Sequence, residues 1–205
     1  MEFIDIDIIT VKIKIQGYVD CHSSFYSCTD VIQDNEYVFQ NGINFLCGEI
    51  DSGGFGISYY ISMYKKINKK TIPSNPSILV NGEKVSADEL SGCACYLDVS
   101  YPLFRSRRSV NAQIKRGLKK SKSNYTTKEV CQMFGISDFR AKRKISATGN
   151  EKFQSMAAIG FAYGKQIYCL PWLSKMRYEG YNNHIPYLLK VLEEQKKITI
   201  VPVGT

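Results

Sequence analysis

The sequence predicts one α/β domain, residues 1–205, with a parallel β-sheet at its core. Strand-like and helix-like segments alternate through the C-terminal half, which is typical of parallel strands joined by crossover helices. A glycine-rich turn also follows a short apolar strand near residue 47 and precedes an apolar helix-like segment. Hydrophobic residues make up 44% of the 205 residues and charged residues 22%, so the chain can bury a sizeable core.

The N-terminal half is predicted to form mainly β-structure. Residues 1–18 alternate in polarity and are rich in isoleucine, which indicates a strand or hairpin. Residues 36–47 resemble two short strands around the turn Asn41-Gly42, and residues 78–85 resemble a second strand–turn–strand unit. Together these segments predict an antiparallel β subdomain beside the parallel sheet. Residues 57–66 are expected to form a helix and residues 65–77 a loop.

The C-terminal half is predicted to contain a small helical lobe followed by the remaining parallel strands. The lobe spans about residues 106–145, which are basic and have two helix-like stretches. Thr126 or Thr127 is expected to cap the second of these, with Glu129 in its first turn. After the lobe, residues 151–164 predict a helix. The other predicted elements are strands at 93–99, 165–171 and 198–204 and an amphipathic helix at 182–197.

Charge and cysteine content say more about the protein's binding partners and cellular compartment than about its activity. A formal charge of +8 and a pI near 9.0 suit nucleic acid, an anionic membrane surface or an acidic protein, and an ordinary excess of surface lysine explains them as well. The seven cysteines are odd in number and several lie in apolar runs, which favours reduced thiols and a cytoplasmic protein. We expect no signal peptide, no membrane span and no metal site.

The glycine-rich turn has the outline of a phosphate-binding loop without its chemistry. Such a loop reads G-x-x-x-x-G-K-[ST] between a strand and a helix, and its lysine and hydroxyl bind phosphate and Mg²⁺. Gly48 and Gly53 have the glycine spacing, with Ser52 between them. Gly54 stands at the lysine position and Phe55 at the hydroxyl position. We therefore interpret the segment as a vestigial nucleotide loop.

The order of elements along the whole chain resembles that of the ATP-binding-cassette (ABC) ATPase domains. Residues 96–114 resemble the Q-loop segment, with Asp98 near the family's glutamine. The strand at 167–170 resembles the Walker B strand, but Pro171 and Trp172 occupy the Asp-Glu positions. The last strand is similar to the one before the switch histidine, with Gly204 at that position. The Ser-Gly-Gly-Gln signature is replaced by Thr148, Gly149, Asn150 and Glu151.

The resemblance implies an ABC-ATPase-like fold, and the substitutions predict that it does not hydrolyse ATP. Hydrolysis needs a carboxylate near Mg²⁺, a group that positions water and cations on the phosphates. Gly54, Pro171 and Trp172 supply none of these groups. Glu49 and Asp51 add negative charge to the loop, which repels phosphate further. We therefore expect no cofactor, while ATP binding without hydrolysis remains an alternative.

The remaining candidate for function is the surface of the basic lobe, whose densest positive segments are residues 105–122 and 140–144. The resemblance places them in the helical subdomain through which ABC domains touch other proteins. We predict a protein-binding or regulatory partner role, with an intact ABC-type ATPase or a second copy of the chain as partner. Two alternatives stay open: a nucleic-acid-binding adaptor, and a regulatory subunit that binds ATP. The candidate partner surface consists of Arg107, Arg108, Lys115 and Arg116.

Overall fold

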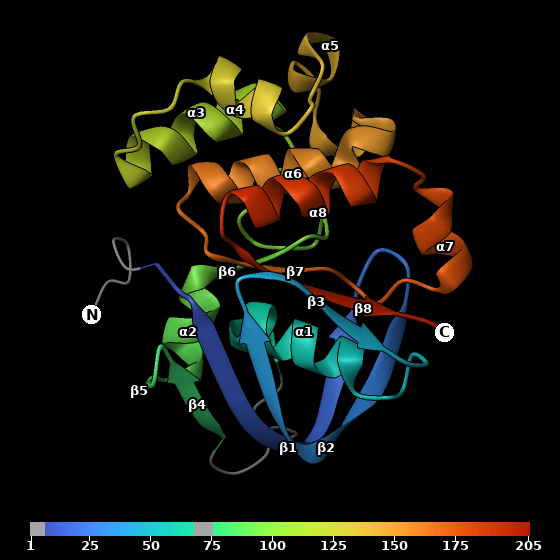
Figure 1. Cartoon of the computed structure of the whole chain (residues 1–205). Helices are drawn as coiled ribbons and strands as arrows, with labels where there is room; N and C mark the ends of the chain where they lie inside the picture. The colour runs from blue at the N-terminus through green and yellow to red at the C-terminus, as the bar shows by residue number, and fades with distance from the viewer. Residues whose placement is uncertain (1–6, 68–75) are drawn as a thin grey trace.

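The chain forms an α/β structure in which one buried helix lies between a parallel and an antiparallel sheet. The computed structural model describes residues 7–67 and 76–205. In Figure 1 the antiparallel sheet lies at the bottom, helix α1 above it, the parallel sheet next, and the remaining large helices at the top. This arrangement confirms the predicted parallel core with an antiparallel β subdomain and a helical lobe.

The antiparallel sheet has the strand order β2-β1-β4-β5. Strands β1 (Thr10–His22) and β2 (Ser27–Gln40) form a long hairpin, and β4 (Ser77–Val80) and β5 (Glu83–Lys84) extend the sheet from β1. Buried and exposed residues alternate along β1, because one face of the sheet covers the core while the other faces solvent. Residues 19–35, for which no element is predicted from the sequence, therefore belong mostly to this hairpin.

The parallel sheet has the order β3-β8-β7-β6. Its strands are β3 (Gly42–Cys47), β8 (Ile198–Val203), β7 (Ile167–Cys169) and β6 (Ala94–Tyr96). The expectation that β3, β7 and β8 are close neighbours in one sheet is confirmed. The pairing expected across Asn41-Gly42 is wrong: β2 and β3 belong to different sheets, because Gly42, with φ of +100°, turns the chain from the antiparallel sheet into the parallel one.

Helix α1 (Gly54–Met63) is the centre of the core. Its residues from Phe55 to Met63 are all buried, because it has one sheet on each side. The turn η2 (Tyr64–Lys66) ends it. Helix α2 (Ala87–Cys93) starts with a capping box in which Ser86 and Glu89 exchange hydrogen bonds, and it leads directly into β6.

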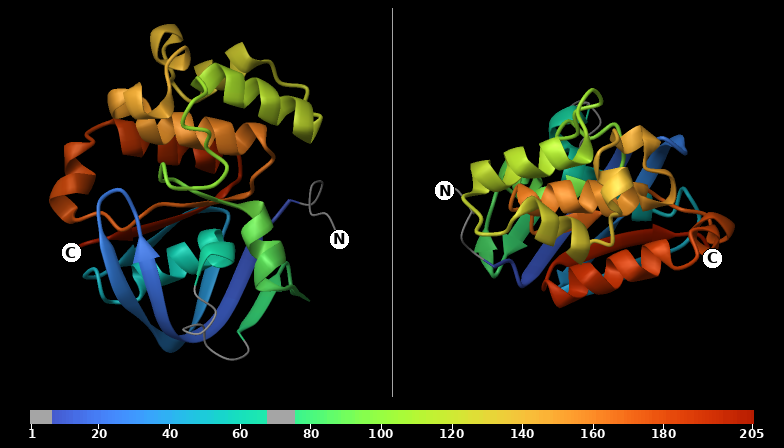
Figure 2. Two further views of the ribbon diagram at one scale, coloured as in Figure 1. Left: turned by 180° about the vertical axis from the view of Figure 1, so that it is seen from behind. Right: turned by 90° about the horizontal axis from the view of Figure 1, so that it is seen from above.

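Helices α6 (Lys152–Ala162) and α8 (His184–Glu194) cover the face of the parallel sheet opposite to α1 (Figure 1). Both correspond to helices predicted from the sequence. The short helix α7 (Lys175–Gly180) joins the end of β7 to α8. Two single turns, η3 (Ile145–Ala147) and η4 (Gly149–Glu151), lead into α6. The view from above in Figure 2 shows α6 and α8 lying side by side.

The helical lobe packs on the outer side of α6, and its three helices lie within the predicted residues 106–145. It contains α3 (Val110–Ser121), α4 (Thr127–Met133) and α5 (Asp138–Ala141). Of the two capping candidates, Thr126 is the cap of α4, and it forms a capping box with Glu129. No helix among residues 7–67 and 76–205 is long and apolar enough to cross a bilayer. All seven cysteines lie in the described residues and are free thiols.

The lobe depends on a close approach between α3 and α6 at Gly117. A Cβ atom at this position would lie 2.6 Å from Cδ2 of Tyr163 and 2.9 Å from the carbonyl carbon of Ala162. Since backbone atoms cannot move aside locally, we expect Gly117→Ala to lower the free energy of unfolding by about 1–3 kcal/mol. Urea denaturation measures this change. Gly92→Ala is the matched control, because a Cβ atom there meets nothing within 4 Å.

Candidate functional site

The glycine-rich loop leaves the carboxyl end of β3 and enters α1, as a phosphate-binding loop does. Its start is fixed by the Gly48 N–H, which donates to the Val203 carbonyl oxygen over 3.0 Å. Both the N–H and the hydroxyl of Ser52 donate to the Glu49 carbonyl oxygen, at 3.1 and 2.7 Å. Gly53 has a φ of +90°, a conformation that favours glycine, and it precedes the first turn of α1. The loop is therefore a tight, internally bonded turn.

The N–H groups at the start of α1 are bound by a carboxyl group of the chain itself. Asp30 on β2 is 0% exposed, and its side chain points into the loop. Its Oδ1 accepts from the Gly53 N–H at 2.9 Å and its Oδ2 from the Gly56 N–H at 2.5 Å. Oδ1 also accepts from the Val31 N–H at 3.0 Å. A helix N-terminus and its loop are the groups with which phosphate-binding loops hold anions.

Two glycines let strand β2 approach the loop this closely. A Cβ at Gly56 would lie 2.9 Å from Cγ1 of Ile32 and 3.2 Å from the carboxyl oxygen of Asp30. A Cβ at Gly53 would lie 2.9 Å from the carbonyl oxygen of Val31. The glycines of this loop thus leave room for strand β2, which packs against the N-terminus of α1.

Burial is the main influence on the pKa of the Asp30 carboxyl group. It raises the pKa of the carboxyl group above its ordinary value of 3.8, and the N–H donors of Gly56, Gly53 and Val31 counteract part of that rise. The nearby carboxylate of Asp51 raises the pKa further. The hydrogen bonds from these N–H donors offset the free-energy cost of burying the Asp30 carboxyl group.

The other motif positions predicted from the sequence lie beside the loop. Trp172, buried after the end of β7, donates from its indole Nε1 to the Gly48 carbonyl oxygen over 3.0 Å. A Cβ at Gly204 would lie 3.0 Å from the Trp172 ring, so the position after β8 is in contact with it as well. Pro171 is buried next to Trp172. The structure therefore brings the loop and the positions predicted to correspond to Walker B and the switch together, with an indole ring between them.

Phe55 does not line an open pocket. It is 0% exposed, and its ring meets the Tyr59 ring edge to face, with the centroids 6.2 Å apart. The expectation that it stands at the hydroxyl position is consistent with its place in the first turn of α1, but its side chain belongs to the core. Gly54 is half-buried against the Leu46 side chain.

Asp98 fixes the tip of the β1–β2 hairpin. This residue, at the predicted glutamine position, is 1% exposed, and its Oδ2 accepts from the N–H and the hydroxyl of Ser24 in the hairpin turn. Its Oδ1 accepts from the Ser100 N–H at 2.9 Å. Two buried carboxyl groups thus hold the hairpin: Asp98 at its tip and Asp30 along β2.

The signature positions lie at the start of α6 and form local contacts. Thr148 is buried and donates from its hydroxyl to the Ile145 carbonyl oxygen at 2.7 Å. Glu151 accepts from the N–H and the hydroxyl of Ser137. Gly149, with φ of +58°, and the exposed Asn150 form the turn before the helix. Among the described residues no hydrogen bond joins these four positions to the glycine-rich loop.

The two basic segments of the lobe are joined in space. The Val110 N–H donates to the Arg143 carbonyl oxygen over 2.9 Å, and Ser109 forms a β-bridge with Lys144. The two basic segments therefore lie side by side where residues 109–110 meet residues 143–144. The side chains proposed for partner binding, Arg107, Arg108, Lys115 and Arg116, are all exposed.

Asp30 is the site residue that the sequence interpretation missed. A weak signal is present, because Cys28, Asp30 and Ile32 alternate along β2 and must share a face of the strand. An acidic residue between two apolar ones on a buried face implies a specific partner. The identity of that partner depends on how β2 packs on α1, which alternation alone does not define.

Comparison with known proteins gives a structural likeness only. No protein-family model matches the sequence, and no curated protein matches it either. A putative ABC transporter ATP-binding protein from Pyrococcus furiosus is 17% identical, with a TM-score of 0.60 over 96% of this chain and 90% of that one.

Two dimeric structures of the ATP-binding cassette MJ0796 are similar to the same extent. One is in a post-hydrolysis state bound to ADP and Pi, and is 14% identical with a TM-score of 0.62. The other is 13% identical with a TM-score of 0.61. Each alignment covers 95% of this chain and 87% of the cassette. The chain therefore has an ABC-ATPase-like α/β fold.

Proposed function

We propose that this chain is an ABC-ATPase-like protein that does not hydrolyse ATP and that works by binding another protein. The observation that carries the proposal is the Asp30 carboxyl group, which already occupies the N–H groups at the start of α1. A nucleotide phosphate would need the same donors. It would also have to displace a carboxyl group that is held by a long hairpin.

The chemistry around the loop supports the same conclusion. No cation stands at Gly54, and Pro171 and Trp172 provide neither a metal ligand nor a base. Asp51 is exposed beside the loop and adds a negative charge. Removing one catalytic group of this kind typically costs several kcal/mol at the transition state, so the absence of all of them leaves no basis for turnover.

The exposed basic surface of the lobe favours binding to another protein as the function of this chain. The joined basic segments form an exposed positive face that suits an acidic partner. The cassette MJ0796 is dimeric in two of the similar structures, which motivates an intact ABC-type ATPase or a second copy of this chain as the partner.

Phosphate release from Mg-ATP tests the absence of hydrolysis. We expect a rate indistinguishable from the buffer background, because the cation, carboxylate and base are missing. The control is Asp51→Trp, which places a bulky side chain at an exposed position of the loop. Turnover by the wild-type protein that disappears in Asp51→Trp would show a working loop and refute the proposal.

A further inference from the structure

A cavity separate from the glycine-rich loop lies near the starts of β6 and β7 in the parallel sheet. It has a volume of about 320 Å³. Two of the residues that line it, Gly92 at the end of α2 and Lys165, lie two residues before the starts of β6 and β7, whereas the glycine-rich loop follows the carboxyl end of β3. Met63 brings the end of α1 to the cavity. The ten residues of α1 span about 15 Å, so the cavity is well removed from the loop.

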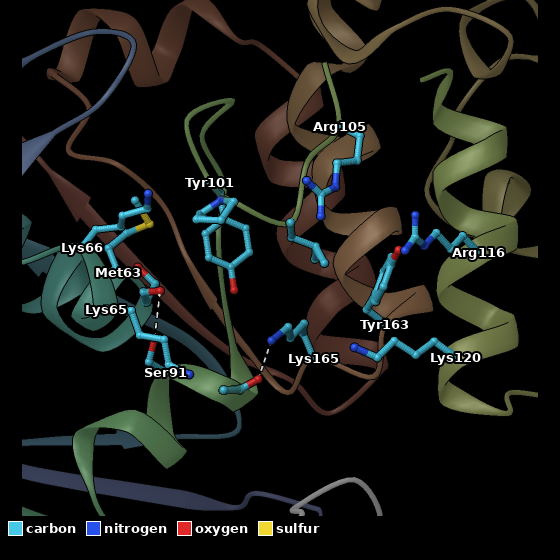
Figure 3. Close-up of a pocket in the computed structure, with 14 residues that line it drawn as sticks. Met63, Lys65, Lys66, Ser91, Tyr101, Arg105, Arg116, Lys120, Tyr163 and Lys165 are labelled. Carbon is cyan, nitrogen blue, oxygen red and sulfur yellow. Dashed lines mark hydrogen bonds between the residues drawn. The ribbon is translucent and has the colours of Figure 1, made fainter. Parts of the chain in front are cut away.

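The wall of this cavity is strongly basic. No carboxylate is among the residues that line it in the described part of the chain. In Figure 3 Arg105 and Lys120 extend from different elements toward Lys165 and the space beside Tyr163. The cationic side chains come from four parts of the chain: Lys65 and Lys66 after α1, Arg105 before α3, Arg116 and Lys120 on α3, and Lys165 before β7.

These positive charges repel one another. Burial lowers the pKa of Lys165, and the ammonium groups of Lys120 and Lys65 lower it further. Arg116 and Lys120 are four residues apart on α3, a spacing at which like charges destabilise a helix. Among the described residues the only ion pair within 4.0 Å is Lys190–Glu194, so no described carboxylate neutralises this group. The Lys165 ammonium donates to the Gly92 carbonyl oxygen, which holds it in the wall.

We propose that this basic pocket binds a small molecule carrying two or more phosphate groups. Several cations converging on a cavity of ligand size match more than one phosphate, and arginine and lysine are the residues that bind phosphate most strongly. A bound polyanion removes the mutual repulsion of the cations. Pro102, Leu103 and the Tyr163 ring form an apolar side that accommodates an organic group attached to the phosphates. The site does not depend on the glycine-rich loop.

Calorimetric titration with inorganic tripolyphosphate tests the basic pocket in the full chain. The wild-type protein should bind one equivalent saturably at physiological ionic strength. Arg105→Gln/Lys120→Gln removes two exposed pocket cations without disturbing the core, and should weaken binding by at least about 30-fold. Lys165→Gln should weaken it independently, whereas Lys165→Arg keeps the charge and should retain most of the affinity.

A matched control separates the basic pocket from the general charge of the protein. Lys119→Gln/Lys128→Gln also removes two positive charges, from exposed lysines that do not line the cavity. Binding in this variant should stay within about threefold of wild type, because screening limits the influence of distant charges. Absence of saturable binding to the wild-type protein overturns the inference. An equal loss of affinity in the pocket and control variants overturns it as well.

Discussion

Asp30→Ala should lower the free energy of unfolding by about 2–5 kcal/mol, because it leaves the buried N–H groups of Gly53 and Gly56 without their acceptor. Each orphaned donor costs about 1–3 kcal/mol, and the two act at the base of the most buried helix. For a chain of this size the melting temperature should fall by about 5–15 °C. Differential scanning calorimetry and urea denaturation measure both quantities.

The control for this change is Asp51→Ala. Asp51 lies near Asp30 in space but is exposed, so its removal should change stability by less than about 0.5 kcal/mol. If Asp30→Ala costs less than about 1 kcal/mol, the carboxyl group is not the structural acceptor that closes the loop. Asp30→Asn should also destabilise, since its NH₂ group would face one of the two N–H donors.

Charge reversal across the basic lobe should slow association with the proposed protein partner by about 10- to 100-fold at low ionic strength, because electrostatics act mainly on the encounter rate. The change replaces four exposed cations with glutamate: Arg107, Arg108, Lys115 and Arg116. The salt dependence of the rate should flatten, and the melting temperature should stay nearly constant. Surface plasmon resonance with the partner recovered from native cells gives the rates.

Two further variants test whether slower association comes from the partner surface of the lobe, from the basic pocket, or from the change in net charge. Because Arg116 also lines the basic pocket, a triple reversal that leaves Arg116 in place distinguishes the partner surface from the pocket. A quadruple control reverses exposed lysines outside the lobe, at Lys12, Lys14, Lys84 and Lys175. Unchanged association after reversal in the lobe, or equal slowing by the control, would show that the interface lies elsewhere.

The parallel core and the helical lobe could be predicted because their segments carry strong local signals. The apolar strand at residues 43–47 lies between Gly42 and Gly48, the strand at 198–203 ends before Gly204, and Thr126 is a clear cap for a helix of the lobe. The predicted pairing of the strands on either side of Asn41-Gly42 was wrong. This dipeptide is typical of a hairpin, whereas here it connects two sheets. Strand partners depend on contacts between distant segments, and local turn chemistry does not specify them.

The candidate site was predictable only in outline. The spacing of Gly48 and Gly53 located the loop, and Trp172, which the sequence singled out together with Pro171 and Gly204, contacts Gly48 and Gly204 in the structure. The role of Trp172 as a donor to Gly48 depends on side-chain direction after β7. The carboxyl group of Asp30 comes from 23 residues before Gly53, across a hairpin whose packing no sequence pattern defines. The basic pocket likewise joins four separate segments.

Amide NMR spectra during a Mg-ATP titration show whether Asp30 keeps ATP from the N–H groups of the glycine-rich loop. The amide signals of Gly53 and Gly56 should stay unchanged up to millimolar ATP in wild-type protein. Any saturable shifts should appear at the basic pocket, for instance at Gly92 and Lys165, and disappear in Arg105→Gln/Lys120→Gln. Saturable shifts of the Gly53 and Gly56 amides with micromolar affinity, retained in that variant, would show that ATP displaces Asp30 and binds the loop.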